Sequence, residues 1–180
     1  MVKKQKILSD DQLSELQDLY ARLKNTKYCR FFNQWDNLYD VNRTQLWPAF
    51  KDHEVLNYLC EHFGMTYENS YFLSYTRGSF TATHVDTDKA NLTLITLIDK
   101  TDDLIGGDVI VIKPLPKREL RGEFRGKEGT RARVGKVIVP EVWPQEVGES
   151  LIYDGGTTHG VTRVKKGERI VLVTWLKEKV

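Results

Sequence analysis

The sequence predicts a mainly β fold, a jelly-roll-like barrel supported by two or more N-terminal helices. Two segments with helical periodicity lie before residue 65. From residue 68 onward the chain consists of short segments rich in β-branched and aromatic residues, each bounded by Gly, Pro or Asp. Helices followed by roughly seven or eight strands are typical of a barrel with a helical layer on one sheet. We therefore expect a single domain over 1–180, with 1–65 as helical support and 66–180 as the barrel.

Two helices are predicted in the N-terminal region. Ser9 and Gln12 have the spacing of a capping box, in which the serine caps the helix and the glutamine reaches back to it. Leucines and a tyrosine at helical spacing then predict a helix over 10–24. A second helix is predicted over 52–63, and Gly64 is a suitable stop.

The β region contains six segments that we assign as strands, with turn-forming residues between them. Between the two helices, residues 28–47 carry several aromatic residues, and this segment either packs on the barrel or forms a loop that faces the substrate. The strands are expected at Ser70–Thr76, Asn91–Ile98, Asp108–Ile112, Val137–Val139, Ser150–Tyr153 and Arg169–Leu176.

Composition excludes several classes of protein. Hydrophobic residues make up 40% of the chain and charged residues 29%, which is ordinary for a globular domain. We find neither a signal-peptide pattern nor an apolar run long enough to cross a bilayer, so a cytoplasmic location and no membrane partner are expected. Cys29 and Cys60 alone do not indicate a disulfide scaffold or a zinc cluster.

A basic segment at about 117–136 interrupts the β region. This segment contains eight basic and three acidic residues, so it carries a charge of about +5, while the rest of the chain carries about −3. A solvated loop would explain this segment. The alternative is a lid or docking loop for an acidic partner, which could include nucleic acid.

His84-Val85-Asp86 is the most informative motif of the chain. Because a strand places residues i and i+2 on one face, His84 and Asp86 can point into one cavity. His159 follows a Gly-Gly-Thr-Thr turn after another predicted strand, and Arg169 opens the last strand. Two neutral imidazoles and one carboxylate form the facial arrangement used by non-haem Fe(II) oxygenases. Arg169 adds a fixed positive charge suited to binding a carboxylate, so the sequence predicts an enzyme.

The other two histidines are interpreted as structural or surface residues. His53 and His62 lie on the second helix or at its edge, nine residues apart and therefore on different turns. Neither has an acidic residue near it at the spacing of metal ligands.

A longer pattern resembles one known family, the Fe(II)/2-oxoglutarate-dependent dioxygenases, and most of all their prolyl 4-hydroxylase-like branch. The resemblance covers about residues 70–176, and it implies a double-stranded β-helix fold. Residues 1–65 resemble that branch only in being helical. The pattern reads Tyr75-x8-His84-x-Asp86, Gly106-Gly107-Asp108, Gly148-Glu149-Ser150-Leu151-Ile152-Tyr153 and His159-x-Val161-x2-Val164-x2-Gly167-x-Arg169-x5-Trp175.

The resemblance also implies roles for individual residues. The three residues His84, Asp86 and His159 would be the iron ligands, and Arg169 would form the salt bridge to the distal carboxylate of 2-oxoglutarate. Two further residues, Tyr75 and Thr96, would line the cosubstrate pocket, the latter near that same carboxylate. Fe(II), 2-oxoglutarate and O2 are the implied cofactor and cosubstrates, with ascorbate as an optional stimulant.

The reaction expected from this resemblance is hydroxylation of an unactivated C–H bond with release of succinate and CO2. The carboxylate of Asp86 favours hydroxylation, since related halogenases have a small residue there. A prolyl residue in a peptide or protein is the first substrate expected, and a free amino acid or other small molecule is the alternative. A nucleic-acid demethylase ranks lower, because no asparagine lies between Arg163 and Arg169. The alternative from another class is a metal-binding barrel that acts as an interaction module.

Overall fold

The structure is a computed structural model. It describes residues 2–27, 29–33, 39–45, 53–87, 89–114 and 138–179. The basic segment at 117–136, with the docking role predicted for it, lies outside these described residues.

The described part of the chain holds two helices and eleven strands in one sheet, so the mainly β class with N-terminal helices is confirmed. The helices are α1 (Asp10–Leu23) and α2 (Glu54–Phe63). The strands are β1 (Lys3–Lys6), β2 (Cys29–Asn33), β3 (Tyr39–Gln45), β4 (Thr66–Tyr75), β5 (Phe80–His84), β6 (Leu92–Lys100), β7 (Val109–Pro114), β8 (Ile138–Trp143), β9 (Glu149–Asp154), β10 (His159–Val161) and β11 (Arg169–Lys177).

Both helices begin with the caps that their sequences favour. The Ser9 hydroxyl accepts a hydrogen bond from the backbone N–H of Gln12, and the Gln12 side chain accepts one from the Ser9 N–H, which confirms the capping box. The side chain of His53 caps α2, and its other ring nitrogen lies 3.3 Å from a carboxylate oxygen of Glu15. The other helical histidine, His62, packs its ring on Phe63. The structural interpretation of these two histidines is therefore confirmed.

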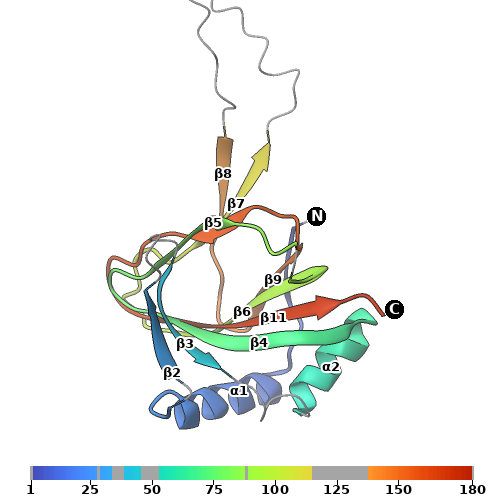
Figure 1. Cartoon of the computed structure of the whole chain (residues 1–180). Coiled ribbons are helices and arrows are strands. Elements are labelled where there is room, and N and C mark those ends of the chain that lie inside the picture. The colour runs from blue at the N-terminus through green and yellow to red at the C-terminus, as the bar shows by residue number, and fades with distance from the viewer. Residues whose placement is uncertain are drawn as a thin grey trace, which may run out of the picture.

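All strand pairings in the sheet are antiparallel, in the order β1-β9-β6-β11-β4-β3-β5-β10-β7-β8, with β2 paired to β3. Figure 1 shows both helices on one side of the curved sheet, while β7 and β8 extend away from its other end. Strands β6, β11 and β4 are consecutive in this order, and β11 pairs along its length with both of the others.

The strand β11 is buried on both faces, and this divides the core into two layers. Leu172 and Leu176 belong to an apolar cluster that also contains residues of both helices. Val171 and Val173 belong to the cluster on the opposite face, which also contains Val111 of β7. Strands from distant positions in the sheet order therefore contact the same interior, so the sheet curves around this second cluster.

Five strands of the structure are absent from the sequence prediction. The described parts of 28–47 form the paired strands β2 and β3, and β3 joins the sheet by pairing with β4 and β5. The first strand, β1, is entirely polar and pairs with β9 at an edge, and β10 has only three residues, so neither has a hydrophobic pattern to detect. The region 1–65 is thus not purely helical. No helix among the described residues is long and apolar enough to span a membrane.

Candidate metal centre

The structure brings His84, Asp86 and His159 together. His84 ends β5 and His159 begins β10, and the two stand opposite each other in the antiparallel pairing of these strands. The possible ligand atoms of all three residues lie within 4.8 Å of one another. Each imidazole Nε2 is 3.7 Å from a carboxylate oxygen of Asp86, His84 from Oδ1 and His159 from Oδ2. The group can therefore hold one ion between its three side chains.

Both imidazoles are held in the same way. The Nδ1 atom of His84 is 2.9 Å from the carbonyl oxygen of Ala82, and Nδ1 of His159 is 2.9 Å from that of Thr157. A carbonyl oxygen only accepts, so each Nδ1 carries a proton, and Nε2, which faces Asp86, is the nitrogen that can bind a metal. This is the tautomer that a metal ligand requires.

The carboxylate of Asp86 is almost fully buried, with a relative exposure of 1%. Its Oδ2 accepts a hydrogen bond from the Thr93 hydroxyl at 3.1 Å, while Oδ1 has no hydrogen-bond partner. A buried carboxylate oxygen without a donor is costly, and a bound cation would offset that cost. The donor set of two imidazoles and one carboxylate fits Fe(II) in the facial arrangement.

A glycine after β9 allows the backbone of Asp86 to reach this position. The Asp86 N–H donates to the carbonyl oxygen of Gly155 at 2.8 Å. A Cβ atom at Gly155 would lie 2.0 Å from the carbonyl oxygen of Ala90. Any larger residue would therefore push apart the two loops that bear the carboxylate and His159.

Burial keeps His159 neutral. Its removal from solvent, followed by repulsion from His84, lowers the pKa of His159 to about 4. Its ring lies 4.5 Å, centroid to centroid, from the ring of Tyr153, a side chain with no exposed surface. Burial also raises the pKa of Tyr153 well above its ordinary value, so this phenol stays protonated. At neutral pH His159 is an unprotonated ligand that needs to lose no proton to bind a metal.

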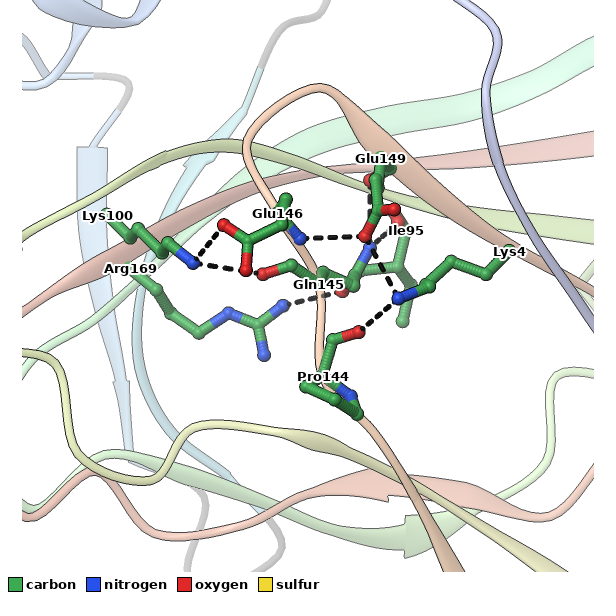
Figure 2. A network of polar contacts seen from close by, with 8 residues as sticks. All are labelled: Lys4, Ile95, Lys100, Pro144, Gln145, Glu146, Glu149 and Arg169. Carbon is green, nitrogen blue, oxygen red and sulfur yellow. Dashed lines mark hydrogen bonds and ion pairs between the residues drawn. The ribbon is translucent and has the colours of Figure 1, made fainter.

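The guanidinium of Arg169 is buried next to the same interior, with 3% relative exposure. It donates to the carbonyl oxygen of Gly107 and, at 2.9 Å, to Oε1 of Gln145 (Figure 2), while its Nε has no partner. Among the described residues, no carboxylate forms an ion pair with Arg169. Burial lowers the pKa of Arg169, yet a guanidinium stays charged at neutral pH. The nearby carboxylate of Asp108 attracts this charge without forming an ion pair with it. A buried cation with a spare donor and no ion-pair partner in the described part of the chain fits a bound carboxylate.

Tyr75 lies beside Arg169, whereas Thr96 lies on the other face of the sheet. Tyr75 stands opposite Arg169 in the pairing of β4 with β11, and its ring centroid is 5.7 Å from the guanidinium carbon. Thr96 stands opposite Leu172, which faces the helices. Its hydroxyl pairs with that of Ser150 at 2.7 Å on that same face. The structure therefore contradicts the assignment of Thr96 to the cosubstrate pocket.

The sequence analysis did not identify three residues that contact Asp86, Arg169 or His159. Thr93, three positions before Thr96, is the hydroxyl on β6 that reaches the interior, where it bonds Asp86. Gln145 binds Arg169 from the loop before β9. Tyr153 lies within the quoted family pattern, but its contact with His159 depends on tertiary structure. Alternation along β6 puts Thr93 and Thr96 on opposite faces, but it does not tell which face is inside.

No protein-family model matches the chain, and no curated protein sequence matches it either. Solved structures match it along almost its whole length. An oxidoreductase of the 2OG-Fe(II) oxygenase family from Burkholderia pseudomallei has a TM-score of 0.66 at 14% identity, covering 97% of this chain and 84% of that one. A prolyl-4-hydroxylase from Pseudomonas putida has a TM-score of 0.66 at 13% identity, covering 99% and 93%. The chain has the fold of the 2OG-Fe(II) oxygenases.

This oxygenase fold serves more than one reaction. A non-heme alpha-ketoglutarate-dependent carbocyclase from nogalamycin biosynthesis has a TM-score of 0.65 at 13% identity, covering 98% of this chain and 80% of that one. The fold is therefore consistent with the metal centre, while the reaction has to be argued from the residues of the site.

Proposed function

We propose that this protein is an Fe(II)- and 2-oxoglutarate-dependent dioxygenase that hydroxylates an unactivated C–H bond. The observation that carries the proposal is that two complementary sites are buried in the same interior. One is a set of metal ligands that can bind a cation, and the other is a positively charged side chain that can bind a carboxylate. His84, Asp86 and His159 offer metal ligands, and Arg169 offers a buried positive charge without a carboxylate partner among the described residues. The curvature of the sheet around its second apolar cluster supports a double-stranded β-helix barrel as the scaffold.

Each residue has a distinct task in this proposal. His84, Asp86 and His159 would hold the iron, and the Thr93 hydroxyl would keep the carboxylate in its orientation. Arg169 would bind the distal carboxylate of the 2-oxo acid, above the ring of Tyr75. Bound iron and 2-oxoglutarate would supply oxidation by O2, with release of succinate and CO2. The buried walls of the interior would exclude water from the reacting groups.

For the substrate, we propose a prolyl residue in a peptide or protein. The family pattern in the sequence and the likeness to the prolyl-4-hydroxylase from Pseudomonas putida support this choice. The basic segment at 117–136 would favour a polypeptide with acidic residues near the hydroxylated position.

The decisive test is binding of the cosubstrate under anaerobic conditions. Protein mixed with Fe(II) and 2-oxoglutarate is expected to show a visible charge-transfer band, which His84→Ala and His159→Ala should abolish. His62→Ala is the matched control, since His62 is exposed on α2 and belongs to no metal-binding group formed by the described residues. If the wild-type protein shows no such band and forms no succinate in the presence of oxygen, the proposed dioxygenase function is refuted.

A second experiment tests the substrate class. The protein is incubated with proline-containing peptides, with and without acidic flanking residues, and the products are searched by mass spectrometry for the gain of one oxygen. Modification of proline in peptides is the expected result. Oxygen gained only by a free amino acid or another small molecule would refute the polypeptide substrate while leaving the reaction class intact.

A further inference from the structure

The loop between β8 and β9 places a buried glutamine against Arg169. Gln145 has a relative exposure of 7%, and its side chain makes hydrogen bonds at both ends of its amide. Figure 2 shows this side chain between the guanidinium and the backbone of Ile95. The sequence offers no motif that would single it out.

The hydrogen bonds fix the orientation of this amide. Nε2 donates to the carbonyl oxygen of Ile95 at 2.8 Å and to that of Glu149 at 2.9 Å. Both of its protons are thus used by acceptors, so Oε1 must face the guanidinium, which can only donate. The bond from Nη2 of Arg169 to Oε1 is 2.9 Å long. Through these hydrogen bonds, Gln145 connects Arg169 to β6, the strand that also carries Thr93.

The acceptors around Arg169 are electrically neutral. Besides Gln145, the guanidinium has the carbonyl oxygen of Gly107 as a hydrogen-bond partner among the described residues. Neutral acceptors hold the plane of the guanidinium without cancelling its charge, whereas a carboxylate in the place of Gln145 would form a buried ion pair. The hydrogen-bond partners of Arg169 thus leave its positive charge available to an anionic ligand, and the nearby Asp108 attracts it without forming an ion pair.

Surface ion pairs anchor the loop that bears Gln145. Lys100 bonds the Gln145 carbonyl oxygen at 3.3 Å and the Glu146 carboxylate at 2.7 Å. Lys4 of β1 bonds the Pro144 carbonyl oxygen at 3.0 Å and lies 3.2 Å from the Glu149 carboxylate (Figure 2). Each exposed pair is weak alone, but together they hold the loop on both sides of Gln145.

We propose that Gln145 is a positioning residue that orients Arg169 and makes the site selective for 2-oxo acids that carry a second, distal carboxylate. This inference rests on the proposed function, because it assigns Arg169 to the cosubstrate. The side chain of Gln145 makes its hydrogen bonds to Ile95, Glu149 and Arg169 rather than to the candidate metal ligands, so its effect on binding passes through Arg169.

The test compares two 2-oxo acids in two glutamine variants. 2-Oxoglutarate and 2-oxopentanoate have the same carbon chain, but a methyl group replaces the distal carboxylate in the second. Their dissociation constants are measured with the anaerobic Fe(II) protein from the charge-transfer band and from calorimetry. Gln145→Leu removes the tie to Arg169, and Gln17→Leu is the matched control. The side chain of Gln17 on α1 also donates to a β6 carbonyl oxygen, that of Ile98, but from the helical face.

The wild-type protein is expected to prefer 2-oxoglutarate by at least about tenfold, because only this acid meets the guanidinium. In Gln145→Leu the preference should fall by about tenfold, the loss typical of a hydrogen bond to a charged group. The affinity for 2-oxopentanoate and for the metal should stay unchanged, and Gln17→Leu should keep the wild-type preference.

Should Gln145→Leu fail to fold, Gln145→Glu serves as the second variant, because it retains the side-chain length and places a negative charge beside Arg169. It too should lose preference for 2-oxoglutarate. An unchanged preference in a folded Gln145 variant, or an equal loss for both acids, would refute the positioning role while leaving the proposed function intact. A wild-type protein that binds neither acid would refute both proposals.

Discussion

Replacing Thr93 by valine would remove one hydroxyl and leave the packing of the interior almost unchanged. Thr93 has no exposed surface, and its hydroxyl is the hydrogen-bond donor given for Asp86 Oδ2. A hydrogen bond to a charged group contributes about 1.5–3 kcal/mol, so the metal-free variant should lose free energy of unfolding in that range. Loss of a partner behind a metal ligand typically lowers metal affinity by about 10–100-fold, and we expect the same here.

A matched variant separates the site from the fold. Thr174→Val removes a hydroxyl that has equally little exposure and bonds Ser70 at 3.2 Å, with no charged group involved. It should cost about 0.5–1.5 kcal/mol and leave the metal affinity unchanged. Chemical denaturation of the metal-free proteins gives the stabilities, and competition titration with Co(II) gives the affinities. Equal metal affinity in Thr93→Val and the wild-type protein would refute the role of this hydroxyl in orienting the carboxylate.

Three further predictions follow from the geometry of the site. In Gly107→Ala, the new Cβ would lie 3.0 Å from Cδ of Arg169, on a residue whose φ is +75°. The affinity for 2-oxoglutarate, measured by calorimetry, should therefore fall while the affinity for Co(II) stays constant. A loss of both affinities would contradict a local effect. Gly155→Ala should displace Asp86 and lower metal affinity together with thermal stability, since its Cβ would overlap a backbone oxygen at 2.0 Å; an unshifted melting temperature would count against the close approach. The low pKa of His159, about 4 against an unfolded value of about 6.5, means that the unfolded chain binds a proton between these pH values and the folded chain does not. The metal-free protein should therefore lose up to about 3 kcal/mol of stability as the pH falls from 6.5 to 4, and His159→Asn should reduce this dependence in denaturation curves.

The candidate ligands could be found from the sequence because strand geometry is local. His84 and Asp86 are two residues apart, and a strand end places such a pair on one side whatever the rest of the fold does. The family pattern supplied the distant partners His159 and Arg169, which the structure brings to the same interior.

The error at Thr96 shows where local reasoning ends. Thr93 and Thr96 lie on the same strand, but their odd separation puts them on opposite faces, and only the partition of the two apolar clusters tells which face is inside. Gln145 could not have been found either, because its role depends on a loop that meets Arg169 only after β6, β9 and β11 have paired. The polar strand β1 lacked the alternation that makes a strand visible, since it contributes backbone pairing and no apolar side chains.

The pairing of His84 with His159 has a mechanical consequence. Strand β10 has three residues and lies between β5 and β7; its ladder to β7 is regular, whereas its ladder to β5 shifts register within that length. An ion shared by these two histidines would act as a cross-link between segments far apart in the chain. Because a shift of β10 by one residue would turn His159 to the opposite face, the ion could be bound in a single alignment. Metal loading would thus select one register of β10 against β5 and slow the separation of these two strands.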